Sequence, residues 1–266
     1  MQRPSRNFVH TLAESARETV SSGYYQVPES SSPKRSLKAA IEDCPCTAII
    51  AEVKFRSPAE GALRSRQDGR DPAGVARSYE RGGAVAISVL TEPKHFEGSI
   101  EYLAQVKRAV SVPVLMKDIV IDPIQIEAAR RVGADAVLLM ASVFRAGLSD
   151  LGLDEMVRLA HSKGLEVLLE AHTKEEYAIA LGADADVIGI NNRDLETLQV
   201  SIDTSRKLLR SGKHGKTVIS ESGLSSRGQL VELSGLGADG FLIGSSLMRS
   251  KNIEKVVREL AGEQRT

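Results

Sequence analysis

Tryptophan is absent from this chain of 266 residues, and aromatic residues make up only 4% of it. A chain so poor in aromatic side chains lacks the stacking platforms with which proteins bind single-stranded nucleic acid. The 35 basic and 35 acidic side chains cancel, so no overall field draws the protein toward nucleic acid or a membrane surface. We therefore expect neither kind of partner, and any anion-binding site has to be local.

Cysteine is scarce as well, since Cys44 and Cys46 form a single Cys-Pro-Cys pair. A zinc site needs further ligands at suitable spacing, which the five histidines do not supply, so we expect no metal and a reduced pair. No apolar run reaches membrane-spanning length, and residues 1–20 lack the apolar core of a signal peptide. These absences predict a cytoplasmic protein.

The chain does have a repeated alternation of apolar runs and amphipathic stretches, typical of parallel strands covered by helices. Eight runs lie near residues 48–54, 85–90, 114–117, 136–140, 166–170, 187–191, 218–220 and 240–243. No Gly-x-Gly-x-x-Gly motif follows the first run, which counts against a doubly wound dinucleotide-binding fold. Eight units in series predict the α/β class and a closed (β/α)8 TIM barrel.

A short motif punctuates these units. Gly-Ala-Asp occurs at residues 133–135, 182–184 and 237–239, and Gly-Gly-Ala at 82–84. Glycine at these positions ends a helix in the left-handed conformation. The small residues predict a tight turn from each helix into the next strand.

The first strand begins late, so we divide the chain into an N-terminal helical extension, residues 1–47, and a barrel domain, residues 48–266. The extension has a helical pattern to about residue 20, a Ser- and Pro-rich break at 28–33, and a second short helix. Such a segment either caps one end of the barrel or forms a loose tail.

Charged side chains end several predicted strands, where TIM barrels carry their chemistry. Glu52 and Lys54 lie two residues apart and so project to the same side, the barrel mouth, while Ala51 and Val53 face the helices. Later strands deliver Lys117, Glu170, Asn191 with Arg193, and Glu221 with Ser222. Any one of these charges also fits a structural ion pair. Two lysines and three glutamates at one mouth favour an acid–base site.

Glycine and serine follow the last two strands, as Ser222-Gly223 and Gly244-Ser245. Glycine lets backbone N–H groups approach an anion, and the recurrent phosphate site of TIM barrels lies at this position. Ser57, after the first strand, adds a hydroxyl from the neighbouring side. These residues predict a phosphate site.

The ordered motifs resemble the indole-3-glycerol-phosphate synthase family from about residue 49 to residue 249. They are Ala-Glu-Val-Lys-x-x-Ser-Pro (51–58), Ala-Ile-Ser-Val-Leu-Thr-Glu (86–92), Lys-Asp (117–118), Gly-Ile-Asn-Asn-Arg-Asp-Leu (189–195), Ser-Glu-Ser-Gly (220–223) and Ile-Gly-Ser-Ser-Leu-Met-Arg (243–249). The resemblance implies a cofactor-free lyase of tryptophan biosynthesis. Its anionic phosphosugar substrate would be 1-(o-carboxyphenylamino)-1-deoxyribulose 5-phosphate, and the N-terminal helical segment would help to cover it.

The resemblance also implies roles for the residues at the mouth. Lys117 would be the general acid of ring closure, and Lys54 and Glu170 would act in dehydration, although either lysine fits either acid step. Glu52 and Glu221 would orient the lysines, and Asn191 would bind a ring nitrogen or a hydroxyl. The phosphate would be held by Ser57, Ser222, Gly223, Gly244 and Ser245. Arg193 would help there or pair with Asp194 or Glu196.

Two positions depart from the family pattern, Ile119 where Phe is usual and Phe55 where a basic residue is frequent. We expect Phe55 to affect surface details only. The remaining histidines singled out, His95, His161, His172 and His214, are expected to be surface residues rather than catalysts.

Two alternatives remain at this point. One is another phosphosugar barrel enzyme, such as a phosphoribosylanthranilate isomerase-like isomerase, although such isomerases use Cys/Asp or Asp/Asp pairs at strand ends. The other is a non-catalytic barrel scaffold. We expect a monomer or a weak oligomer.

Overall fold

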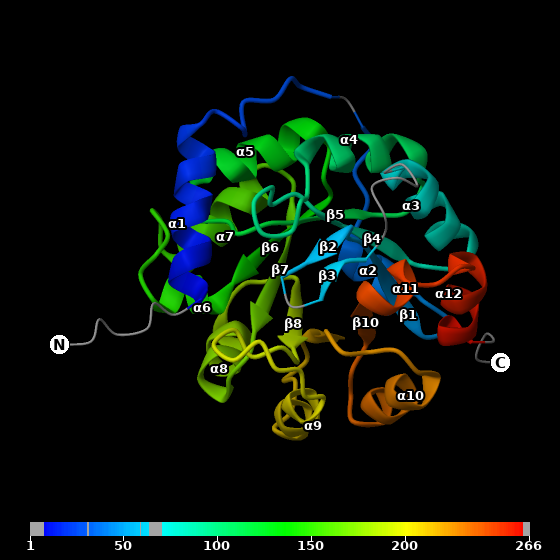
Figure 1. Cartoon of the computed structure of the whole chain (residues 1–266). Helices are drawn as coiled ribbons and strands as arrows, with labels where there is room; N and C mark the ends of the chain where they lie inside the picture. The colour runs from blue at the N-terminus through cyan, green and yellow to red at the C-terminus, as the bar shows by residue number, and fades with distance from the viewer. Residues whose placement is uncertain (1–7, 31, 59, 64–70, 263–266) are drawn as a thin grey trace.

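A closed barrel of eight parallel strands forms the centre of the molecule, in the order β1-β10-β9-β8-β7-β6-β5-β4 (Figure 1). This computed structural model describes residues 8–30, 32–58, 60–63 and 71–262. The barrel strands are β1 (Ala48–Val53), β4 (Ala86–Leu90), β5 (Val114–Lys117), β6 (Ala136–Met140), β7 (Glu166–Ala171), β8 (Val187–Asn191), β9 (Thr217–Glu221) and β10 (Gly240–Ile243). The predicted TIM barrel is confirmed, and every predicted strand overlaps an observed one.

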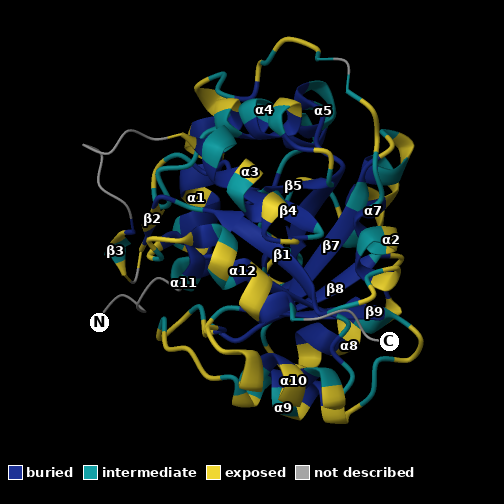
Figure 2. Ribbon diagram, turned by 90° about the vertical axis from the view of Figure 1, so that its right-hand side faces the viewer, coloured by how far each residue is buried: buried dark blue, intermediate teal, exposed yellow. Residues whose placement is uncertain are grey.

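Helices surround the barrel, with buried inner faces and exposed outer faces (Figure 2). They are α3 (Pro72–Arg81), α4 (Ile100–Ala109), α5 (Pro123–Val132), α6 (Ala141–Arg145), α7 (Leu153–Ser162), α8 (Lys174–Gly182), α9 (Asp203–Arg210), α10 (Arg227–Gly235), α11 (Ser245–Met248) and α12 (Ile253–Ala261). A short hairpin, β2 (Arg56–Ser57) with β3 (Gly61–Ala62), follows β1. Within the described ranges, none of the helices has the length and apolar character to cross a membrane.

Successive strand residues enter two separate apolar clusters. Ala51 and Val53 pack between β1 and the helices, as predicted, whereas Ile50 points into the barrel. This alternation follows from the period of two of a β-strand. It sends Glu52 into the barrel, in line with Ile50.

The N-terminal extension covers both ends of the barrel rather than one. Helix α1 (Phe8–Ser21) lies beside α6 and packs Leu12 against the barrel-interior cluster near Met140 (Figure 1). Helix α2 (Leu37–Glu42) lies at the amino ends of the strands, where Ile41 approaches Gly240 and Glu42 accepts a hydrogen bond from Thr217. The alternative of a loose tail is wrong for this described part of the extension. The division into two domains stays a prediction.

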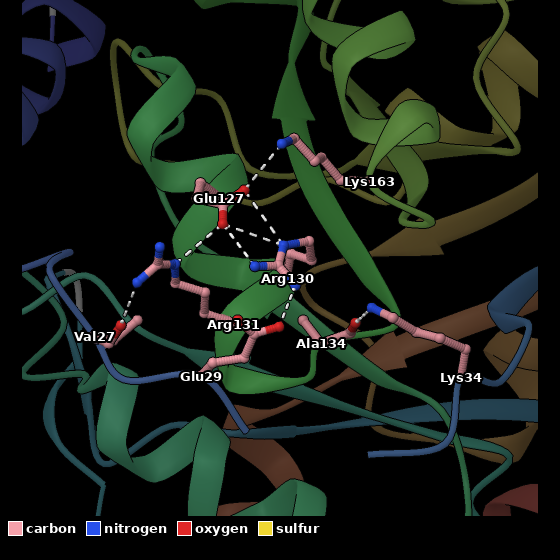
Figure 3. Close-up of polar contacts among 8 residues, drawn as sticks. All are labelled: Val27, Glu29, Lys34, Glu127, Arg130, Arg131, Ala134 and Lys163. Carbon is pink, nitrogen blue, oxygen red and sulfur yellow. Dashed lines mark hydrogen bonds and ion pairs between the residues drawn. The ribbon is translucent and has the colours of Figure 1, made fainter. Parts of the chain in front are cut away.

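The connection between α1 and α2 is fastened to α5 (Figure 3). Arg131 donates a hydrogen bond to the Val27 carbonyl at 3.3 Å, and Arg130 lies 2.8 Å from the Glu29 carboxylate. Further along, the Lys34 ammonium donates to the Ala134 carbonyl at 2.6 Å. These contacts route the chain down the outside of the barrel, from its mouth to its base.

The Gly-Ala-Asp repeat has a structural role that the sequence interpretation missed, because only its small residues were considered. The carboxylates of Asp135, Asp186 and Asp239 accept hydrogen bonds from the backbone N–H of Val114, Val167 and Val218, each at 2.8 Å. The backbone N–H of each aspartate donates to the carbonyl of the same valine. In the second copy Asp186, not Asp184, takes this role. Each aspartate therefore joins the start of its strand to the start of the strand before it.

The first of these aspartates forms a fully buried ion pair. The Lys107 ammonium lies 2.6 Å from Asp135, and the two side chains are 1% and 0% exposed. Removing one partner of such a pair leaves the other charge buried without compensation.

We predict that Lys107→Met lowers the free energy of unfolding by about 3–5 kcal/mol, because Asp135 loses its cation. Lys163→Met is the matched control, since Lys163 is 39% exposed and its pair with Glu127 is worth at most about 1 kcal/mol. Urea unfolding of both variants measures the difference. Equal losses in the two variants would contradict the role given to the buried pair.

Candidate active site

A cavity of about 320 Å³ opens at the carboxyl ends of the barrel strands. Helix α1 contributes Phe8 and Leu12 to its wall, and Phe96 and Ile119 add further apolar surface. The cavity brings together the residues that the sequence singled out: Glu52, Lys54, Ser57, Lys117, Glu170, Asn191, Arg193, Glu221, Ser222, Gly223, Gly244 and Ser245. Their convergence is a structural finding, while their roles stay predictions.

Four of these side chains, Glu52, Lys117, Glu170 and Glu221, come from alternate strands of the barrel. Two residues earlier, the same strands place Ile50, Leu115, Leu168 and Ile219 in the apolar interior. TIM barrels fill their interior with layers of four side chains from alternate strands. The layer at the mouth of this barrel is therefore made of charged groups instead of branched apolar ones.

The Lys117 ammonium is the centre of the charged layer. Its Nζ donates a hydrogen bond to Glu170 Oε2 at 3.1 Å and lies 3.6 Å from Glu221 Oε2. On the first strand, Lys54 Nζ lies 2.7 Å from Glu52 Oε1. Both lysines are mostly buried, whereas the three carboxylates are almost completely buried. The structure brings the two lysines and three glutamates together at the mouth of the barrel, as the sequence predicted; their chemical roles stay predictions.

The two carboxyl groups around Lys117 differ in protonation. Burial alone would raise the pKa of Glu170, but Lys117 and His172 outweigh it and hold that pKa far below its usual range. Burial raises the pKa of Glu221 to about 8, and the nearby carboxylates of Glu170 and Glu52 add to the shift against Lys117. Burial would also lower the pKa of Lys117, but the three carboxylates reverse this and raise it. These shifts favour the ionised form of Glu170, the charged form of Lys117 and the protonated form of Glu221.

Two glycines make room for the carboxylates. A Cβ on Gly189 would stand 2.0 Å from Glu221 Oε1, and a Cβ on Gly244 would stand 2.5 Å from Glu52 Oε1. Both distances are far below van der Waals contact, so neither position accepts a side chain while the carboxylate stays in place. Gly189 belongs to the motif Gly-Ile-Asn-Asn, but its spatial role was not evident from the sequence.

The segment after β9 turns sharply at the edge of the cavity. Ser222 and Gly223 both have left-handed backbone conformations, with φ of 67° and 75°. Asn192 holds this turn, since its Nδ2 donates to the Ser222 carbonyl and to Ser220 Oγ, each at 3.0 Å. Sequence reasoning passed over Asn192 in favour of Asn191, because nothing in the local pattern distinguishes the two amides.

Arg193 faces the cavity and contacts the hairpin after β1. Its Nη2 lies 3.3 Å from Glu60 Oε1, and Arg249 Nη2 lies 2.5 Å from Glu60 Oε2. Glu60 and Arg249 were not singled out from the sequence. Their pairing joins the loops after β1, β8 and β10 across one side of the mouth.

Two expectations about individual side chains are wrong. His172 is not a surface residue, because its side chain is 7% exposed and its Nε2 lies 3.2 Å from Glu170 Oε1. Phe55 is not a surface detail either, because it is buried and packs edge-on against Tyr102 with ring centroids 5.6 Å apart. Both residues come directly after a barrel strand, Phe55 two residues beyond β1 and His172 one residue beyond β7, and both side chains are buried there.

Fold and charges together define a (β/α)8-barrel enzyme with a cluster of buried lysine and glutamate side chains at the carboxyl ends of its strands. Among solved structures, thiamine phosphate pyrophosphorylase from Pyrococcus furiosus is similar, with a TM-score of 0.58 and 19% identity over 82% of this chain and 94% of that chain. N-acetylmannosamine-6-phosphate 2-epimerase from Clostridium perfringens gives 0.59 and 14% over 82% and 93%. Identities this low show the shared fold alone.

Sequence comparison gives the family. The model of the indole-3-glycerol phosphate synthase family matches residues 5–260. Proteins named indole-3-glycerol phosphate synthase are 45% identical in Aquifex aeolicus, over 81% of this chain and 82% of that one, and 44% identical in Methanopyrus kandleri, over 85% and 87%. The chain belongs to the indole-3-glycerol phosphate synthase family, whose members are decarboxylating lyases of tryptophan biosynthesis. The resemblance drawn from the motifs is confirmed.

The protonation of Glu221 predicts a pH-dependent stability difference. Its folded-state pKa lies above its unfolded-state pKa, so its contribution to stability is complete below about pH 4.5 and is lost as the pH rises through about 8. Glu221→Gln does not titrate. We expect the variant to gain stability over the parent between pH 5 and pH 8, by up to about 1.4 kcal/mol per pH unit.

Urea unfolding at pH 5, 6.5 and 8 measures this difference. Glu232→Gln is the control, because Glu232 pairs with Arg206 at the surface and its pKa is lowered, so its effect stays constant over this range. A constant difference between parent and Glu221→Gln would show that Glu221 is ionised throughout.

Proposed function

We propose that this cavity converts 1-(o-carboxyphenylamino)-1-deoxyribulose 5-phosphate to indole-3-glycerol phosphate, CO2 and water. The observation that carries the proposal is the Lys117 ammonium, 3.1 Å from Glu170 Oε2 and 3.6 Å from Glu221 Oε2, at the mouth of a member of this family. The isomerase and scaffold alternatives lose their support, because the family match covers nearly the whole chain.

Ring closure forms a bond between an aromatic carbon and the ketone carbon of the substrate. Negative charge develops on the ketone oxygen as this bond forms, and an ammonium group beside that oxygen supplies a proton. Lys117 suits this role because the surrounding carboxylates keep it charged. Loss of CO2 then leaves an electron pair that restores the aromatic ring, so the protein does not need to store electrons.

Dehydration needs an acid for the departing hydroxyl and a base for the proton that leaves the ring system. Lys54 supports the first role, and before decarboxylation it can also hold the substrate carboxylate. Glu170 supports the second, because Lys117 and His172 keep it ionised. Glu52 orients Lys54 through the 2.7 Å contact. The assignment of the two lysines to the two acid steps follows their positions in the family motifs.

The phosphate end of the substrate is proposed to bind at the residues that follow β1, β9 and β10. The Ser222-Gly223 turn, the Gly244-Ser245 segment and Ser57 line the same cavity. Arg193 supplies positive charge, with Asn191 Oδ1 accepting a hydrogen bond from its backbone N–H at 2.9 Å. The apolar wall from Phe8, Leu12 and Ile119 suits the aromatic ring. The cytoplasmic location and the monomeric or weakly oligomeric state stay predictions.

We predict that Lys117→Ala lowers kcat by about 10²–10⁴-fold, the usual contribution of a positioned proton donor. Indole fluorescence from the anilino-deoxyribulose phosphate measures the rate in parent and variant. Lys163→Ala, on the outer surface, controls for the loss of a lysine. Activity in neither protein would overturn the proposed reaction, and equal activity in both would overturn the role of Lys117.

A further inference from the structure

His172 lies outside the cavity, directly behind one of its carboxylates. It is the first residue after β7, two positions beyond Glu170, and its side chain is 7% exposed. Its Nε2 lies 3.2 Å from Glu170 Oε1, and its Nδ1 lies 3.3 Å from Glu176 Oε2 at the start of α8. The His172 backbone N–H also donates to Glu176 Oε2 at 2.9 Å. The imidazole therefore lies between two carboxylates: its Nδ1 hydrogen-bonds to Glu176, whereas its Nε2 is close to Glu170 as a charge contact and has no hydrogen-bond partner in the described part of the chain.

These contacts extend the charged layer into a row of titratable groups that are alternately acidic and basic. From the helix to the cavity the row runs Glu176, His172, Glu170, Lys117 and Glu221, with separations of 3.3, 3.2, 3.1 and 3.6 Å between neighbouring groups. A buried charge is tolerated where opposite charges flank it. Glu170 has a cation on each side only if His172 is an imidazolium, since Lys117 lies on its other side.

The carboxyl groups of Glu170 and Glu221 both lie beside Lys117, but they differ in whether a second basic side chain lies next to them. Glu170 has Lys117 on one side and His172 on the other. Neither oxygen of Glu221 has a hydrogen-bond partner in the described part of the chain, and Lys117 lies 3.6 Å away. A single buried lysine between two carboxyl groups leaves one of them in need of a proton, and the second cation decides which.

We propose that His172 is a positioning residue that keeps Glu170 ionised and aimed at Lys117, so that the proton of this carboxyl pair resides on Glu221. The inference rests on the proposed function in giving Glu170 the role of base. His172 acts through Glu170 and does not line the cavity.

The carboxylates around His172 support its protonation. Glu170 on β7 and Glu176 on α8 contact it directly, and Asp194 after β8 adds a further negative charge. Arg145 on α6 interacts with Glu176 on the outer side. Burial alone would lower the pKa of His172, but Glu170 and Glu176 outweigh it and raise the pKa to about 9. The imidazolium therefore persists below about pH 9.

The charge state is tested in the unaltered protein by ¹⁵N NMR of the histidine rings. We expect both ring nitrogens of His172 to carry protons at pH 7.5, with titration well above that of an exposed histidine near 6.5. His161→Asn and His172→Asn variants assign the signals. A neutral His172 ring at pH 7.5 would overturn the proposal, whatever the protein's activity.

The effect on Glu170 is tested by the pH dependence of kcat/KM in His172→Asn. Because the parent Glu170 stays ionised far below its usual range, we expect the acid limb of Glu170 to rise toward the measurable pH range in the variant, since an opposite charge within this distance typically shifts a carboxyl pKa by 1–3 units. His161→Asn removes a histidine that pairs with Asp186 at the other end of the barrel, and should leave the limb in place. A loss of activity that is uniform with pH would show a structural role only.

Two further measurements separate the possible failures. If His172→Asn does not fold, Glu176→Gln removes the outer carboxylate instead and should move the acid limb in the same direction by a smaller amount. If the parent is inactive on the proposed substrate, the proposed function fails. ¹³C NMR titration of the Glu170 carboxyl, with and without His172→Asn, then tests the inference alone: an unchanged titration would overturn it.

Discussion

The contact between the Lys117 ammonium and the carboxyl groups of Glu170 and Glu221 is the interaction on which the account of this site depends. Its three members come from β5, β7 and β9, and all are largely buried. Taking such charges out of water costs several kcal/mol each, which only close opposite charges offset. The carboxyl ends of β5, β7 and β9 must therefore be aligned for these groups to meet. The site thus depends on the register of the strands throughout the barrel.

The opposite end of the barrel meets that requirement. Asp135, Asp186 and Asp239 each fasten one strand start to the preceding strand, and α2 covers the same end through Ile41. Because a strand slipped by one residue would send every side chain to the other face, fixed starts determine which side chains reach the mouth. The hydrogen bonds at the amino ends of the strands therefore help to determine which side chains line the cavity at the carboxyl ends.

Much of the strand arrangement was predictable from the sequence, because successive side chains of a β-strand point to opposite faces. The alternation of strand residues predicted that Glu52 faces the mouth and Val53 the helices, and both predictions are confirmed. His172 is also two residues beyond Glu170, but it follows the end of β7 and lies outside the cavity, so the strand period does not predict its contact with Glu176. Glu60 and Asn192 are different, since their partners lie far away in the sequence and are brought near only when the strands assemble, and no local pattern contains that information.

Neutron diffraction from crystals of the parent in D2O, near neutral pD and without substrate, tests the central claim most directly, because it locates each deuterium in the charged layer. The account predicts three deuterons on Lys117 Nζ, one on the Glu221 carboxyl group and none on that of Glu170. A deuteron on Glu170, or a neutral Lys117 amine, would contradict it.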